Sequence, residues 1–143
     1  MKISTLLQAK GTSVFTISPD ASVAEAVGSL GEHNIGALVV STDGRVVNGI
    51  MSERDVVRAV GCLGSAALAA PVSAIMSVEV RTTSRDDTVE SLMMTMTQHR
   101  IRHVPVLENG ELAGMVSIGD VVKNRMEELE RDRNALVDYI NAR

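Results

Sequence analysis

Aromatic residues are nearly absent from this 143-residue chain, which contains one Phe, one Tyr and no Trp. The sequence therefore lacks the aromatic platforms on which single-stranded nucleic acids stack. Its net charge of −4 also argues against the basic face that a general nucleic-acid-binding protein requires. No apolar run approaches the roughly 18 residues that a membrane-spanning helix needs. The single cysteine, Cys62, cannot form an internal disulfide. These absences predict a cytoplasmic protein that binds neither nucleic acid nor membrane.

Aliphatic residues are abundant instead. The hydrophobic fraction is 45%, eight residues are Met, and the charged fraction of 22% is ordinary for a globular domain. We expect a core of Val, Ile, Leu and Ala in which flexible Met side chains fill the gaps.

The most informative feature is an internal repeat. "TISPDASVAEAVGSLGEHNIGALVV" aligns with "TTSRDDTVESLMMTMTQHRIRHVPV", so that His33 corresponds to His99, 66 residues later. After one extra residue in the first copy, Gly49 corresponds to Gly114 at an offset of 65. The chain thus divides into two similar units and a tail. The predicted divisions are residues 1–66, residues 67–125 and a helical extension, 126–143.

Each unit has the same predicted order of elements. A short extended segment (14–17 or 78–83) precedes a helix with apolar residues at helical spacing. Two β-rich runs follow, joined by Asp-Gly or Asn-Gly as in a hairpin, and a second helix ends the unit. One unit is too small to bury both faces of its sheet. We therefore predict an α/β (α+β) protein with two pseudo-twofold related β-α-β-β-α units. They would pack sheet to sheet around one core, with clefts between them.

A motif recurs where each second helix begins: "GIMSERD" and "GMVSIGD". Ser52 and Ser117 stand at predicted N-caps, with Asp55 and Asp120 three residues later, which is the pattern of a helix-capping box. The same arrangement favours anion binding, because a helix N-terminus has free N–H groups and an aspartate can accept hydrogen bonds from a ribose diol. The two interpretations are compatible, and the sequence leaves both open.

The ordered recurrence of "SVAEAV…HNIGALVV…DGRVVNGIMSERDVV" and "TVESLM…HRIRHVPVLENGELAGMVSIGDVV" resembles a tandem pair of cystathionine beta-synthase (CBS) domains, called a Bateman module. The resemblance covers about residues 1–125, and the small stand-alone form of the chain resembles bacterial free-standing CBS proteins. It implies regulatory binding of adenosyl ligands in the clefts, in flat disc-like dimers.

The resemblance also implies roles for particular residues. Asp55 and Asp120 would bind ribose hydroxyls, and Ser52 and Ser117 would bind phosphate. Adenine would lie in apolar slots, although plain core packing explains their apolar residues equally well. The slot residues implied are Thr16, Ile17, Ile35 and Ala37 in the first unit and Thr82, Thr83, Ile101, Val104 and Pro105 in the second. Gly36 and Ile118 complete the expected contacts.

The two units supply positive charge differently. The first carries Arg54 inside its motif, whereas the second has Gly119 there and places Arg102 and His103 before its strand. If the units pack antiparallel, Arg102 or His103 would converge with Arg54; otherwise all three are solvated surface charges. The difference predicts two unequal sites, and Gly119 would leave room for a larger ligand.

Signals of catalysis or of metal binding are missing from the sequence. The three histidines lack metal-ligand spacing, and no nucleophile–base pair or carboxylate dyad stands out. We therefore predict no enzyme activity, no metal site and no catalytic cofactor.

The tail "VVKNRMEELERDRNALVDYINAR" has a helical pattern with a regular apolar stripe. Arg133 interrupts the stripe, which follows alternating four- and three-residue steps. This stripe either packs on the chain's own core or forms a coiled-coil seam with a second copy. Its apolar members are Val122, Met126, Leu129, Leu136 and Ile140.

The sequence thus predicts a homodimeric sensor of adenine nucleotides that regulates an unidentified protein partner. The expected ligands, in order, are AMP, then NAD and ATP or ADP, with S-adenosylmethionine as a further candidate. Two alternatives stay open: a structural dimerisation module with inactive sites, and an enzyme acting on a nucleotide.

Overall fold

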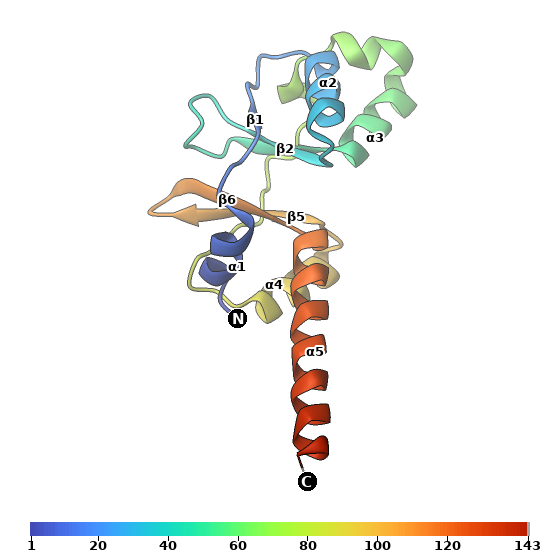
Figure 1. The fold of residues 1–143 in the computed structure, drawn as a ribbon. Coiled ribbons are helices and arrows are strands. Elements are labelled where there is room, and N and C mark those ends of the chain that lie inside the picture. The colour runs from blue at the N-terminus through green and yellow to red at the C-terminus, as the bar shows by residue number, and fades with distance from the viewer. Residues whose placement is uncertain (143) are drawn as a thin grey trace.

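The computed structural model describes residues 1–142 as two similar sheet-and-helix units and a long final helix (Figure 1). The first unit and the segment before it contain α1 (Ile3–Lys10), β1 (Thr16–Ile17), α2 (Val23–His33), β2 (Ala37–Val40), β3 (Gly49–Ser52) and α3 (Glu53–Leu63). Two short 3-10 helices, η1 (Gly64–Ala69) and η2 (Val72–Ala74), lead to β4 (Thr83–Ser84), α4 (Val89–His99), β5 (His103–Glu108), β6 (Glu111–Ser117) and α5 (Ile118–Asn141).

The two sheets have the same topology. In the order β1-β2-β3, the first pair is parallel and the second antiparallel, and the sheet β4-β5-β6 repeats this arrangement. The parallel neighbours are joined through a helix, as a parallel connection requires. In Figure 1 the two sheets lie one above the other, with α2 and α3 beside the first and α1, α4 and α5 beside the second. The predicted fold class of two β-α-β-β-α units packed sheet to sheet is confirmed.

The central strand β2 shows how the sheets are covered. All four of its residues are buried, because helices cover one face and the other sheet covers the second. Leu38 and Val40 belong to the first unit's core, and Val39 lies on the opposite face of the strand. The prediction of one core is wrong in this respect. The buried side chains form two core clusters, one in each unit, because each sheet packs its own helices separately.

The second predicted hairpin is a tight turn, but the first is not. Asn109 and Gly110 both adopt positive φ between β5 and β6, as a two-residue hairpin turn requires. In the first unit, the predicted β-rich run after Asp43-Gly44 begins at residue 45, but β3 begins only at Gly49, so residues 45–48 form no strand. The Asp43 carboxylate accepts hydrogen bonds from the backbone N–H of Arg45 (2.8 Å) and of Val46 (2.9 Å), and this local turn replaces the strand ladder.

The segments that lead into the two units are exchanged. Helix α1, which the sequence analysis did not predict, inserts Ile3, Leu6 and Leu7 into the second unit's core. Conversely, Val72, just before the second unit, packs in the first unit's core. The strands that follow are also shorter than predicted: β1 is confined to residues 16–17 and β4 to 83–84. The division of the chain at residue 66 stays a prediction, since packing crosses that boundary in both directions.

The motif glycines make room for these exchanged segments. A Cβ atom on Gly49 would lie 2.8 Å from Met76 Sδ and 2.8 Å from the Ser77 carbonyl oxygen. A Cβ atom on Gly114 would lie 3.0 Å from Leu7 Cδ2. Glycine therefore begins the motif in both units because a neighbouring segment lies directly against the strand.

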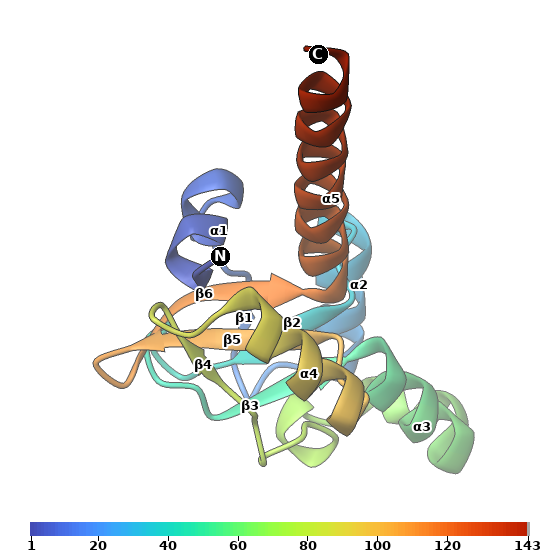
Figure 2. The same ribbon diagram turned by 90° about the horizontal axis from the view of Figure 1, so that it is seen from below.

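Helix α5 leaves the body of the protein after its first turns (Figures 1 and 2). Only Val121 and Asn124 are buried along its 24 residues, so most of the helix does not pack on its own chain. No helix within residues 1–142 is both long enough and apolar enough to cross a membrane.

Candidate functional site

A cleft of about 940 Å³ lies between the two units and is lined by residues from both. This is the size of a small-molecule binding site. The ends of β3 and β6 open onto it, and so do the first turns of α3 and α5. The repeated motifs therefore meet in one cleft.

Both motifs form complete capping boxes. Ser52 Oγ accepts a hydrogen bond from the Asp55 N–H, while the Ser52 N–H donates to Asp55 Oδ2 at 2.9 Å. Ser117 and Asp120 repeat this, with the Ser117 N–H 2.8 Å from Asp120 Oδ2. The predicted capping role is thus observed in both units. Because each box uses Oδ2, the Oδ1 atoms of the two aspartates lie outside it.

The two aspartates have different further partners. Ser77 Oγ lies 3.5 Å from Asp55 Oδ1, whereas the Lys10 ammonium lies 2.6 Å from Asp120 Oδ2. Burial raises the pKa of Asp120, but the hydrogen bonds from Lys10 and from the Ser117 N–H outweigh it, so the net pKa is below the ordinary value. The two halves of the cleft are therefore unequal, in a way that the sequence did not indicate.

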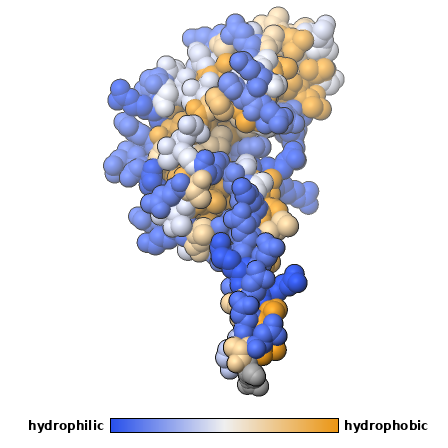
Figure 3. Space-filling view, viewed as in Figure 1, coloured by the Kyte–Doolittle hydropathy of each residue, from blue (hydrophilic) through white to orange (hydrophobic). Residues whose placement is uncertain are grey.

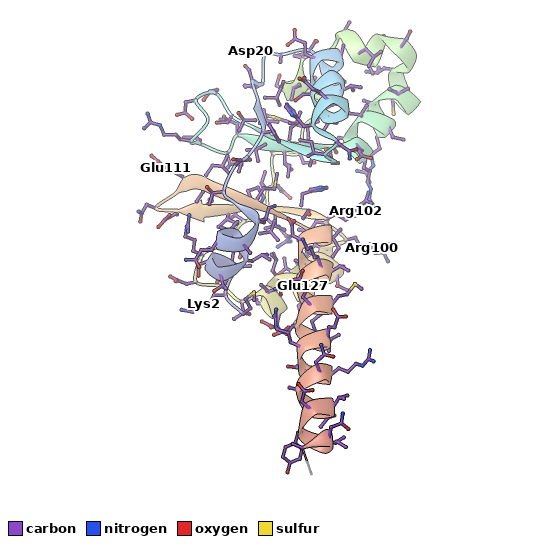
Figure 4. The ribbon with its side chains drawn as sticks, in the orientation of Figure 1. Lys2, Asp20, Arg100, Arg102, Glu111 and Glu127 are labelled. Carbon is purple, nitrogen blue, oxygen red and sulfur yellow. The ribbon has the colours of Figure 1, made fainter. Side chains whose placement is uncertain are left out.

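Positive charge is concentrated in the cleft although the chain is acidic. The lining includes six of the chain's fourteen Lys and Arg side chains but only four of its eighteen carboxylates. The cations are Lys10, Arg54, Arg58, Arg81, Arg100 and Arg102. Figure 4 shows Arg100 and Arg102 at the edge where the second unit faces the first. Such a surface attracts an anion such as a phosphate.

His103 meets the first unit across the cleft. A Cβ atom on Gly36 would lie 2.8 Å from Glu53 Oε1 and 3.0 Å from His103 Cε1, so the absence of a side chain on Gly36 accommodates both groups. Burial lowers the pKa of His103 and Arg102 lowers it further, with Glu53 and Asp120 partly offsetting them. Arg54 from the first unit and Arg102 and His103 from the second all line the cleft, and their convergence on one ligand stays a prediction.

Most of the predicted contact residues lie at the cleft. Those that line it are Ile35, Gly36, Ala37, Ser52, Arg54, Asp55, Ile101, Arg102, His103, Ser117, Ile118, Gly119 and Asp120. The structure does not place the other six in the lining: Thr16, Ile17, Thr82, Thr83, Val104 and Pro105.

The physical reasons are local. Val104 is fully buried in the second unit's core, and Pro105 is buried on the opposite face of β5. Thr83 is held in the second sheet, where its hydroxyl donates to Asp87 at 2.7 Å, and Ile17 packs against the first core. Thr16 and Thr82 are exposed.

The sequence analysis missed several residues of the apolar lining. Val14 and Val80 correspond at the offset of 66, and Ile50 and Met115 at the offset of 65; all four line the cleft. Strand alternation was the available signal, because Ile50 and Met115 precede the core-facing Met51 and Val116. Lys10 had no such signal, because it comes from the unpredicted helix α1.

The only phenylalanine also lines the cleft. Phe15 stacks on His33 with ring centroids 3.8 Å apart and an interplanar angle of 14°. It is 43% exposed, so part of this aromatic side chain is accessible beside the cleft. Within residues 1–142 no cluster of three or more His, Cys, Asp or Glu side chains is arranged to hold a metal ion.

The family model for the CBS domain matches residues 11–61 and again residues 72–127. The chain belongs to the CBS domain family. The two matches correspond to the two sheet-and-helix units, which are hereafter called CBS repeats 1 and 2. A mitochondrial CBS domain-containing protein of Arabidopsis thaliana is 36% identical over 96% of this chain and 71% of its own length. A CBS domain-containing protein of Bacillus subtilis is 33% identical over 80% of this chain and 81% of its own length, and neither relative carries a catalytic name.

Solved structures of CBS proteins have the same fold. The crystal structure of a CBS-domain protein from Agrobacterium tumefaciens is 50% identical, with a TM-score of 0.84 over 87% of this chain and 99% of that one. A CBS domain protein from Pyrobaculum aerophilum, whose structure was solved in complex with AMP, is 29% identical. Its TM-score is 0.75 over 84% of this chain and 89% of that one.

Proposed function

We propose that this CBS pair is a regulatory sensor that binds adenine nucleotides in the cleft between its repeats. The observation that carries the proposal is the meeting of two Ser-x-x-Asp boxes at one cleft with an excess of positive charge. An adenosine phosphate matches this chemistry, because it combines an apolar ring, a diol and an anion. The AMP complex of the Pyrobaculum aerophilum relative supports the same ligand class.

Each part of the nucleotide has a proposed place. Asp55 and Asp120 accept hydrogen bonds from the ribose hydroxyls through the carboxylate oxygens outside the boxes. Ser52 and Ser117, at the helix N-termini, contact phosphate together with the nearby arginines. The adenine lies against the apolar lining contributed by the paired residues Val14 and Val80, Ile35 and Ile101, and Ile50 and Met115.

AMP is the ligand that we expect first, followed by NAD and by ATP or ADP, with S-adenosylmethionine as a further candidate. The signal is a change in the relative angle of the repeats or of the dimer, which an unidentified protein partner detects. We place this activity in the cytoplasm, consistent with the acidic chain and its single cysteine.

A homodimer is part of the proposal. The apolar stripe on α5 is exposed, with Met126 at 65% and Leu129 at 52%, and a second copy would cover it. Figure 3 shows apolar surface along this projecting helix.

Calorimetric titration with AMP, ADP, ATP, NAD and S-adenosylmethionine tests the function. Asp55→Asn and Asp120→Asn each keep an amide oxygen to accept the capping N–H but remove the charge. We expect each to fold normally and to weaken nucleotide binding in its own half of the cleft by roughly tenfold or more, since hydrogen bonds to charged groups contribute about 1.5–3 kcal/mol.

Ser22→Ala is the matched control for capping. Ser22 accepts the Glu25 N–H at 3.1 Å in α2 but does not line the cleft, so its loss should cost about 1 kcal/mol of stability with unchanged binding. If none of the five ligands binds or raises the melting temperature of the wild-type protein, the cleft is inactive and the module is structural. Turnover of ATP or NAD would instead favour the alternative in which the protein is an enzyme that acts on a nucleotide.

A further inference from the structure

Asp55 and Asp120 differ mainly because Lys10 forms an ion pair with Asp120. Asp120 Oδ2 accepts from the Ser117 N–H at 2.8 Å, from Ser117 Oγ at 2.9 Å and from the Lys10 ammonium at 2.6 Å. Among the residues that the structure describes, Asp55 has no ion pair of this kind. Its contacts are those of its own capping box and the distant hydroxyl of Ser77.

Lys10 is held in place rather than free in solvent. It ends α1, which Ile3, Leu6 and Leu7 anchor in the core of CBS repeat 2. Its ammonium also donates to the Met115 carbonyl oxygen at 2.6 Å. The Lys10 and Asp120 side chains are only 29% and 24% exposed, so solvent weakens their attraction less than it would at an open surface.

CBS repeat 1 has no equivalent ammonium. In the register that pairs His33 with His99, Lys10 corresponds to Met76, which is uncharged and packs against Gly49. The difference is therefore built into the exchanged segments that lead into the repeats, outside both motifs.

We propose that Lys10 fixes the order in which the two halves of the cleft fill. In the ligand-free protein its ammonium, bound to Oδ2, offsets the charge of the Asp120 carboxylate and makes Oδ1 a weaker acceptor, so an adenosine group binds first at Asp55. Binding at Asp120 follows at a higher ligand concentration, because the ribose diol there meets a carboxylate whose charge Lys10 already offsets. This inference rests on the proposed function, because it concerns the affinity of the same cleft for the same ligand class.

A different role for Lys10 predicts the opposite change in AMP affinity when the lysine is removed. If the ammonium instead bound the phosphate, its removal would weaken AMP binding and leave adenosine, which has no phosphate, unaffected. If it masks the ribose-binding carboxylate, its removal strengthens the binding of both ligands. Adenosine and AMP together therefore separate the two roles.

The experiment measures binding at the second half in a protein whose first half is weakened. In an Asp55→Asn background, calorimetric titration with adenosine and with AMP compares Lys10 with Lys10→Met, which introduces the residue found at the corresponding position. We expect Lys10→Met to tighten the binding of both adenosine and AMP about tenfold. Lys10→Gln, which keeps polarity but removes the charge, should do the same and provides a second variant if the methionine protein folds poorly. Circular dichroism monitors folding in each case.

Lys2→Met is the charge-matched control. Lys2 is exposed just before the other end of α1 (Figure 4), so its replacement should leave both affinities unchanged. If the wild-type protein binds AMP but Lys10→Met leaves the affinity of the Asp120 half unchanged or weaker, this inference is overturned and the proposed function stands. If neither the wild-type protein nor Lys10→Met binds either ligand, both are overturned.

Discussion

The ammonium nitrogen of Lys10 lies 2.6 Å from Asp120 Oδ2, although the two residues are 110 positions apart in the chain. This ion pair ties the last turn of α1, which precedes CBS repeat 1, to the Ser-x-x-Asp motif of CBS repeat 2. It thereby connects the exchange of leading segments to the chemistry of the cleft.

The ion pair should make the stability of the protein depend on pH. The pKa of Asp120 is lowered in the folded state, so its contribution is present above the ordinary value of 3.8 and is lost as the pH falls through the folded-state value. At pH 7 we expect Lys10→Met to be about 1 kcal/mol less stable than the wild-type protein. The difference should narrow below pH 4, and the hydrogen bond to Met115 should account for what remains. Urea denaturation of both proteins from pH 7 to pH 3 measures this difference in stability. A difference that stays constant with pH would contradict the assignment of the pH dependence to the Lys10–Asp120 ion pair.

The glycines that begin the two motifs should differ in their tolerance of a side chain. Gly49→Ala directs its methyl group at the Ser77 carbonyl oxygen, which the Ile50 N–H holds at 3.0 Å, so the backbone must move. We expect a loss of about 2–3 kcal/mol. Gly114→Ala meets only the side chain of Leu7 and should cost about 1 kcal/mol.

Gly28→Ala is the control for these substitutions. Gly28 lies in α2 with open space around its would-be Cβ atom, so alanine should stabilise the helix by roughly 0.5–1 kcal/mol. Urea denaturation compares the three variants. Equal losses for Gly49→Ala and Gly114→Ala would show that the neighbouring segments yield equally.

The element order and the paired motifs were predictable because they depend on local patterns that recur. Ser52 and Ser117 cap helices by contacts three residues away, and such contacts are visible in a single stretch of sequence. The exchange of leading segments was not predictable, because the position of Lys10 depends on packing of Leu6 and Leu7 against a distant strand. Some residues of the expected adenine slot lie outside the cleft lining for a related reason. The residue pattern does not distinguish the core face of a strand, where Val104 lies, from the cleft face.

His103 should couple nucleotide binding to proton uptake. Burial and Arg102 lower its pKa, with Glu53 and Asp120 opposing and Lys10 adding to the decrease, so the imidazole is largely neutral at pH 7 in the free protein. A bound phosphate would favour the charged imidazole. AMP affinity should therefore rise as the pH falls from 8 to 7, with a fraction of a proton taken up per AMP.

Calorimetry at pH 7 in buffers of different ionisation enthalpy measures this uptake. Adenosine is the control ligand, because it lacks the phosphate that would raise the pKa. His103→Asn should abolish most of the linkage. Undiminished proton uptake in that variant would assign the proton to another group.

The exposed stripe on α5 should determine the oligomeric state. Leu136 and Ile140 are 60% and 59% exposed, so neither supports the fold of a single chain, and both continue the spacing of a coiled-coil seam. We expect Leu136→Glu to prevent formation of the proposed homodimer without unfolding the single chain. Arg133→Leu should strengthen dimerisation, because it completes the stripe that the arginine interrupts. Arg131→Glu, on the opposite face of the helix, is the control and should leave the oligomeric state unchanged. Sedimentation equilibrium over a range of concentrations distinguishes these outcomes; a wild-type protein that stays monomeric throughout would show that α5 does not pair with a second copy.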